Sequence, residues 1–115
     1  MSVLHKFAGA SGSLHNFGMI GPYERFKQHQ GVYLFGALLR NGTFNVLYVG
    51  KSKNLADRPS PNHEKFDAAL RLGMSHVGGS LCYSEGECDQ IEQDLIRKFC
   101  PPLNQQHNVL AGLLR

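Results

Sequence analysis

The residues of this chain that could do chemistry together are two tyrosines, an arginine and a glutamate. Tyr33 ends a Gly-Val-Tyr triplet, Tyr48 begins a Tyr-Val-Gly triplet, Arg58 stands eight residues after the second triplet, and Glu92 comes much later. A phenol can orient or activate water, although with a pKa near 10 it is a poor base at neutral pH. A guanidinium neutralises phosphate, and a single carboxylate suits a Mg²⁺ ion that keeps most of its waters.

A β-hairpin is predicted to position the two tyrosines. Residues 32–39 and 44–49 are rich in β-branched, aromatic and leucine side chains, and the Asn-Gly dipeptide at 41–42 is a strong hairpin signal. A two-residue turn there places four residues on one face of the sheet, as the opposed pairs Tyr33/Gly50 and Phe35/Tyr48. Gly50 then leaves an opening beside the Tyr33 ring. Two tyrosines on one face are also ordinary amphipathic packing, so the pattern alone leaves both readings open.

Glu92 lies in a predicted helix over residues 85–99, which opens with a capping box at Ser84 and Glu87. On a helical wheel Glu92 falls in the middle of the apolar stripe formed by Cys88, Leu95, Ile96 and Phe99. An ionised carboxylate at such a position must be protonated, paired with a cation or bound to a metal. A buried ion pair with Arg58 would satisfy it as well as a metal would.

The remaining segments complete a β-β-α-α-β-α order around one sheet. Ser52 is predicted to cap a short helix over residues 53–58. A second helix after Asn62 has Phe66, Ala69 and Leu70 at helical spacing and ends at Gly73, and residues 76–83 form a third strand weakened by glycines.

The two ends of the chain are less patterned. Residues 1–30 are interpreted as an N-terminal extension of irregular structure, with a short helix at 22–29. Residues 31–104 are the expected domain, and residues 105–115 form a C-terminal tail that adds a last helical turn.

Composition favours a single globular domain. The chain has 115 residues, 42% of them hydrophobic and 18% charged, which is too apolar for a disordered chain, and no apolar run is long enough to span a bilayer. The formal charge is +3, and five of the nine acids lie within residues 85–94, which leaves twelve Lys and Arg against four acids elsewhere. That larger, basic part is the one that could face phosphates.

The three cysteines indicate reduced thiols and a cytoplasmic location. An odd number leaves one thiol unpaired under any disulfide scheme, and the N-terminus has no basic stretch followed by an apolar run. A zinc site made of Cys82, Cys88, Cys100 and His76 is disfavoured, because spacings of six and twelve without a Cys-x-x-Cys pair are unlike structural zinc motifs. Buried free thiols are the expected state.

The ordered set of motifs resembles the GIY-YIG endonuclease superfamily. The set consists of Gly-Val-Tyr, Tyr-Val-Gly, the following arginine, the helix glutamate and Pro-Leu-Asn at 102–104, and it spans residues 31–104. The segment IEQDLIRKFCPPLN, residues 91–104, is especially similar to the incision subunit of bacterial nucleotide excision repair and its stand-alone relatives. The resemblance implies a small α/β (α+β) domain, with helices flanking a three-stranded antiparallel sheet. It also implies metal-dependent DNA hydrolysis that leaves a 5′-phosphate and a 3′-hydroxyl.

The resemblance also implies a role for each matching residue. Glu92 would be the sole protein carboxylate on a Mg²⁺ or Mn²⁺ ion, and Arg58 would neutralise the attacked phosphate. Tyr33 would activate or orient the water, and Tyr48 would support it by hydrogen bonding. These roles agree with phosphoryl transfer, which needs positioning and positive charge at the oxygens that gain charge.

Three further residues are expected on the substrate side of the site with Arg58. Lys51 occupies a position near the second tyrosine where the family often has a lysine, and it could depress the pKa of the Tyr33 phenol. Lys53 adds a second cation, and Asn104 matches an asparagine that braces the site.

One position departs from the family pattern. Members often carry a Tyr or His four residues after the arginine, but here that residue is Asn62, with His63 one further, and Pro59 directly follows the arginine. His63 is either a general base or phosphate contact through an altered loop, or an exposed histidine in the first turn of a helix.

Two functions remain open from the sequence. The first is a Mg²⁺- or Mn²⁺-dependent DNA endonuclease, and the second is a catalytically inactive module of the same fold that binds nucleic acid or protein. DNA is the expected partner, and no membrane is. The chain is too short for a separate DNA-reading domain, so specificity is expected from residues 1–30, loop insertions, self-association or a recruiting protein. A homodimer is also a candidate because cutting both strands with one site per subunit needs two subunits or two visits.

Overall fold

The centre of the fold is a hairpin of two strands, β3 (Gly31–Leu38) and β4 (Phe44–Ser52), in a computed structural model that describes residues 3–104. Tyr33 pairs with Gly50 and Phe35 pairs with Tyr48, which confirms the predicted register at the two tyrosines.

The tip of this hairpin differs from the prediction, although the register is right. The N–H of Leu39 donates to the carbonyl of Thr43 (2.8 Å) and the N–H of Gly42 donates to the carbonyl of Leu39 (3.0 Å). Gly42 has φ +88°, so the loop has three residues and ends in a left-handed glycine. A β-bulge leaves Leu47 without a cross-strand partner, since Phe35 pairs with Tyr48 and Gly36 with Val46. The extra loop residue shifts the pairing register by one position and the bulge shifts it back, so the pairs at the two tyrosines are those predicted.

Three more strands complete an antiparallel sheet among the described residues: β1 (Val3–Ala8), β2 (Leu14–Ile20) and β5 (His76–Leu81). The order across the sheet is β1-β2-β5-β3-β4. The predicted third strand is therefore confirmed as β5. The predictions of a three-stranded sheet and of an irregular segment over 1–30 are wrong, because β1 and β2 add two strands, and residues 22–29 form no helix.

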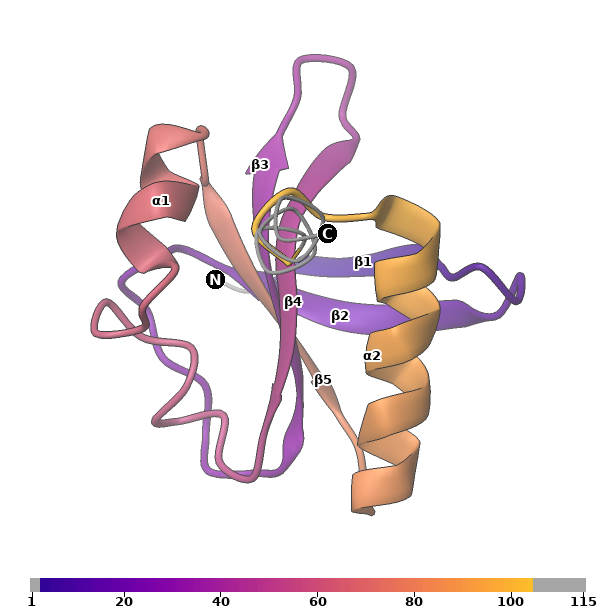
Figure 1. Ribbon diagram of the computed structural model, residues 1–115. Coiled ribbons are helices and arrows are strands. Elements are labelled where there is room, and N and C mark those ends of the chain that lie inside the picture. Colours follow the sequence, from indigo (N-terminus) through magenta and orange to yellow (C-terminus); the bar gives the residue numbers. More distant parts are fainter. Residues whose placement is uncertain (1–2, 105–115) are drawn as a thin grey trace, which may run out of the picture.

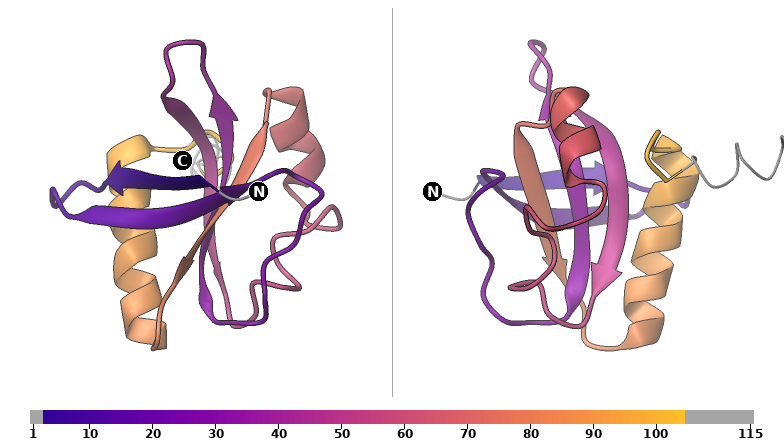
Figure 2. Two further views of the ribbon diagram at one scale, coloured as in Figure 1. Left: turned by 180° about the vertical axis from the view of Figure 1, so that it is seen from behind. Right: turned by 60° about the vertical axis from the view of Figure 1, so that its left-hand side comes forward.

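The β1–β2 hairpin is fixed to the rest of the molecule through one carboxylate. The backbone N–H and the hydroxyl of Ser11 donate to Asp94 (both 2.8 Å), and Nε2 of His15 lies 2.8 Å from the same group. The hydrogen bond with His15, followed by those from Ser11, lowers the pKa of Asp94 to about 2. Gly9 is required beside it, because a Cβ there would collide with the Asp94 carboxylate. The tip of the hairpin therefore docks on the helix over residues 85–99, which carries Asp94 (Figure 2).

Two helices cover opposite faces of the sheet (Figure 1): α1 (Phe66–Arg71) and α2 (Glu85–Phe99). The α1 face buries the side chains of Tyr33, Phe35, Leu55, Phe66, Ala69 and Val77. The α2 face buries a second cluster, which includes Val32, Leu34, Val49, Cys88 and Leu95. Strand alternation produces the two layers, because successive side chains of β3 and β4 enter different clusters.

Two of the four helices predicted within residues 3–104 are confirmed, as α1 and α2. Ser84 accepts from the N–H of Glu87 (3.1 Å) and caps α2, while the Glu87 side chain reaches back to the N–H of Tyr83 (2.8 Å). Residues 53–58 form turns instead of a helix, and Ser52 caps the first of them by accepting from the N–H of Asn54 (3.0 Å). The segment that carries Arg58 is therefore a loop.

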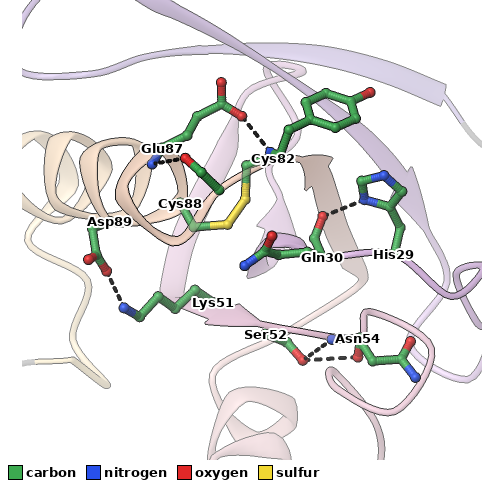
Figure 3. The surroundings of a disulfide bond; sticks show 11 residues. His29, Gln30, Lys51, Ser52, Asn54, Cys82, Glu87, Cys88 and Asp89 are labelled. Carbon is green, nitrogen blue, oxygen red and sulfur yellow. Dashed lines mark hydrogen bonds and ion pairs between the residues drawn. A yellow bond between two sulfur atoms is a disulfide. The ribbon is translucent and has the colours of Figure 1, made fainter.

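A disulfide joins Cys82, just after β5, to Cys88 in the first turns of α2 (Figure 3). Both cysteines are buried. The expectation of reduced thiols is therefore wrong, and since disulfides are typical of oxidising compartments, the argument from thiols to a cytoplasmic location no longer holds. Across residues 3–104, neither helix has the length and apolar character that crossing a membrane requires.

The outer edge of β4 is covered by the segment after α2. The side-chain amide of Asn104 accepts from the N–H of Val49 (2.8 Å) and donates to its carbonyl (2.9 Å). The N–H of Leu103 donates to the carbonyl of Leu47, the bulge residue (3.1 Å). These contacts satisfy backbone groups that an edge strand would otherwise leave open. The tail predicted over 105–115 lies outside the described residues.

Candidate active site

The two tyrosines stand side by side on the α1 face of the sheet. Their ring centroids are 6.1 Å apart, Tyr33 is 1% exposed, and Tyr48 is partly buried. A Cβ on Gly50 would lie 2.6 Å from the Tyr33 ring and hydroxyl. The opening predicted beside the Tyr33 ring is therefore filled by the ring itself, which leans across Gly50.

His63 completes this aromatic group and is not an exposed histidine. It is 4% exposed, and its Nε2 lies 2.7 Å from the Tyr33 hydroxyl. Its ring centroid lies 5.1 Å from the rings of both Tyr48 and Phe35. The loop between β4 and α1 therefore delivers His63 to the first tyrosine of the motif.

The hydrogen bonds of His63 determine where its proton resides. The backbone N–H of Lys65 donates to Nδ1 of His63 (2.9 Å), so Nδ1 carries no proton. The neutral ring then has its proton on Nε2, which donates to the oxygen of Tyr33. Burial, followed by the charge of Arg58, lowers the pKa of His63 to about 4, so the ring is neutral at neutral pH. In this state His63 cannot accept the Tyr33 proton at Nε2, and it acts on Tyr33 as a positioning residue.

Tyr33 is a neutral phenol in this environment. Burial raises its pKa well above the ordinary value of 10, and a hydrogen bond from Arg58 opposes that rise. Since His63 donates to its oxygen, the hydroxyl proton of Tyr33 is left to point toward another acceptor.

Arg58 lies at the rim of this group, with 44% of its side chain exposed. Its Nη2 donates to both carboxylate oxygens of Glu64, at 3.0 and 3.1 Å. The alternative in which Glu92 pairs with Arg58 is therefore wrong, because Glu64 takes that place. Sequence reasoning missed Glu64, since Asp57 and Asp67 are also close to Arg58 along the chain and no pattern distinguishes the three acids.

Glu92 reaches the site from the other layer. It is half-buried on α2, and burial raises its pKa, while the ammonium of Lys51 acts in the opposite direction. Lys51 projects from β4 toward α2 and forms an ion pair with Asp89, one turn before Glu92 (Figure 3). The hydrogen bond with Asp89 raises the pKa of Lys51. Lys51 is therefore a partner of the α2 carboxylates and not of Tyr33.

The two layers meet around β4, which is the edge strand on this side. Burial raises the pKa of Tyr48, and the negative charges of Glu64 and Glu92 raise it further. The pKa of Tyr48 is therefore raised by one carboxylate from the loop before α1 and by one from α2. The structure brings Tyr33, Tyr48, Arg58 and His63 together on one face, with Glu92 and Lys51 coming from the other.

The donor groups fit a water-rich divalent cation. Glu92 is a half-buried carboxylate whose ionised form gains from nearby positive charge. Within residues 3–104, no three His, Cys, Asp or Glu side chains converge as a closed metal site would need. A single carboxylate with substrate oxygens and water is an arrangement that suits Mg²⁺ better than zinc.

Two of the residues expected to bind substrate, Asn104 and Lys53, lie at the edge of β4 and beside the disulfide. The amide of Asn104 is engaged with the backbone of β4, so it braces the strand that carries Tyr48. Lys53 lies with Lys51 along a cavity of about 180 Å³ beside the disulfide, which is lined by Gln30, Lys51, Ser52, Lys53, Glu85 and Cys88. Both lysines therefore stand on the same side as the α2 carboxylates.

Comparison of the chain with protein-family models, curated proteins and solved structures found no match.

Proposed function

We propose that this protein is a GIY-YIG-type endonuclease that hydrolyses DNA phosphodiesters with a single Mg²⁺ or Mn²⁺ ion. The observation that carries the proposal is the convergence of Tyr33, His63 and Arg58 on one face of the sheet, with His63 hydrogen-bonded to Tyr33 at 2.7 Å. A tyrosine packed for stability alone does not need a buried, oriented histidine and a guanidinium at its hydroxyl.

Each side chain has a role in this proposal. Arg58, exposed at the rim, binds the attacked phosphate and exchanges Glu64 for it. Tyr33 orients the attacking water through its hydroxyl, and His63 fixes that hydroxyl by donating to its oxygen. Glu92 would hold the divalent ion, which when bound supplies positive charge at the phosphate and lowers the pKa of water.

One observation favours the second candidate, a catalytically inactive module that binds nucleic acid or protein. Nη2 of Arg58 is already paired with both oxygens of Glu64, which leaves less of the guanidinium for a phosphate. The net contribution of this exposed ion pair is only about 0 to 1 kcal/mol, however, so a phosphate dianion or monoanion can displace it.

Plasmid nicking separates the two candidates. Supercoiled DNA with Mg²⁺ or Mn²⁺ should be nicked by the wild type and not by Glu92→Gln or Arg58→Ala. Glu85→Gln, an exposed glutamate on the same helix, is the matched control and should nick like the wild type. Equal nicking by all four proteins would refute the assignment of the site, and no nicking by the wild type would favour the inactive module.

A further inference from the structure

The segment between β2 and β3 has a composition that the proposed catalysis does not use. Residues 21–30 contain neither helix nor strand, and they interleave aromatic and basic side chains: Tyr23, Arg25, Phe26, Lys27 and His29. Tyr23 is 71% exposed, and Arg25 and Lys27 are also exposed. Aromatic rings alternating with exposed cations are typical of surfaces that bind unpaired nucleic-acid strands.

This segment lies against the loop that carries Arg58. The carbonyl of His29 accepts from the N–H of Leu55 (2.8 Å), and the carbonyl of Gln30 accepts from the N–H of Cys82 (3.2 Å). Leu55 and Arg58 belong to one compact turn, in which the N–H of Arg58 donates to the carbonyl of Asn54 (3.2 Å). Figure 1 shows the two loops running together beside the sheet, below α1.

A cavity of about 360 Å³ lies under this segment, lined by Phe26, Lys27, Gln28, His29, Leu55, Gly79 and Leu81. Its volume falls within the range of about 300 to 1,000 Å³ that is usual for small-molecule sites. The Phe26 ring lies over Gly79 of β5, where a Cβ would be only 2.8 Å from the ring. The glycine therefore admits the ring and fixes one wall of the cavity.

Two residues of the lining, Lys27 and His29, carry groups that suit a nucleotide. Tyr83, 76% exposed, packs edge-on against His29 with ring centroids 5.2 Å apart. Nδ1 of His29 donates to the carbonyl of Gln30 (2.7 Å), so in the neutral ring Nε2 is an acceptor. The exposed ammonium of Lys27 can meet a phosphate.

We propose that this cavity is a nucleobase pocket, which takes an unpaired base of the DNA strand whose phosphate meets Arg58. The base stacks on the ring of Phe26. Gln28 and His29 offer hydrogen bonds to the edge of the base, and Lys27 binds the adjoining phosphate. The inference rests on the proposed function for the choice of DNA and of the neighbouring phosphate. The substrate class that follows is DNA with an unpaired base, and not a perfect duplex.

Binding of short single-stranded DNA, followed by fluorescence anisotropy in EDTA so that no metal-dependent cleavage occurs, tests the pocket. An abasic site is moved along the strand one position at a time. Since a stacked base contributes about 1 to 3 kcal/mol, one abasic position should weaken binding by at least about fivefold. That penalty should vanish in Phe26→Leu, where a stacking ring is lost but apolar volume is largely kept.

Two matched controls keep the test sharp. Phe44→Leu removes a partly buried ring from the α2 face and should retain the abasic penalty. Lys27→Ala should weaken all strands, whereas Lys6→Ala, an exposed lysine on β1, should not. The pocket is overturned if no abasic position matters, if Phe26→Leu and Phe44→Leu behave alike, or if a perfect duplex binds as tightly as the single strand.

The same experiment separates this inference from the proposed function. An abasic penalty in a protein that does not nick plasmid would retain the pocket and reject the nuclease. Nicking by a protein with no abasic penalty would retain the nuclease and reject the pocket.

Discussion

Acidification should destabilise the protein through His63 before most carboxylates are protonated. In the unfolded chain a histidine has a pKa near 6.5, and burial lowers the pKa of His63 to about 4 in the folded state. Above pH 6.5 both states are neutral, so His63 makes no difference. Between pH 6.5 and 4 the unfolded chain binds a proton that the folded chain does not, so the free energy of unfolding falls as pH falls. A difference of roughly 2.5 units corresponds to about 3 kcal/mol.

The comparison to make is urea unfolding, followed by circular dichroism, of the wild type and His63→Gln from neutral pH down to about pH 4. Glutamine keeps a polar group near Tyr33 but does not titrate. Asp94, with its pKa lowered to about 2, loses its contribution mainly below this window, and Glu92, with its raised pKa, changes in both proteins alike. The wild type should therefore lose about 3 kcal/mol relative to the variant. Parallel pH curves for the two proteins would refute the buried, neutral His63 described above.

Three further changes test other contacts. Asn104→Ala removes two hydrogen bonds to β4 and should lower the free energy of unfolding in urea by about 1 to 3 kcal/mol. The control Asn45→Ala removes an exposed side chain of β4 and should change that free energy by less than about 0.5 kcal/mol. Equal effects would mean that the amide does not hold the strand edge. Glu64→Gln should release Arg58 and tighten DNA binding in EDTA, with a stability change under about 1 kcal/mol; unchanged or weaker binding would show that the ion pair does not compete with phosphate. Gly9→Ala should lower the melting temperature because its methyl group displaces the α2 carboxylate, and an unchanged melting temperature would contradict that contact.

The two hairpins show why the sequence predicted one part of the sheet and not the other. Both have the same three-residue loop: the N–H of Gly9 donates to Ser13 as that of Leu39 donates to Thr43, and both loops end in a glycine with φ +88°. The second was recognised because Asn-Gly follows a long apolar run. The first was missed because Ser-Gly is a weaker signal, and because His5-Lys6 in β1 and His15-Asn16 in β2 interrupt both the apolar run and the strict alternation that indicate a strand.

The site was predictable where strand alternation determines it. Pairing and alternation alone place Tyr33 and Tyr48 on one face. The position of His63 was not predictable, because it depends on a loop whose turns follow no period, and the helix expected over 53–58 obscured it. The partners of Arg58 and of Glu92 were also beyond the sequence, since several acids were close enough along the chain to serve.

The offset between the hairpin tip and the Leu47 bulge has a consequence for changes of chain length. Removing one tip residue would leave a two-residue loop that the Leu39 and Thr43 pair still closes, so the pairs Phe35/Tyr48 and Tyr33/Gly50 would persist. Removing Leu47 would straighten the strand at the bulge and would keep the same pairs. Removing Val49 instead would shift the rest of β4 by one position and bring Lys51 opposite Tyr33. The tip and the bulge are therefore the two places in this ribbon where a single deletion should leave the contents of both layers in place.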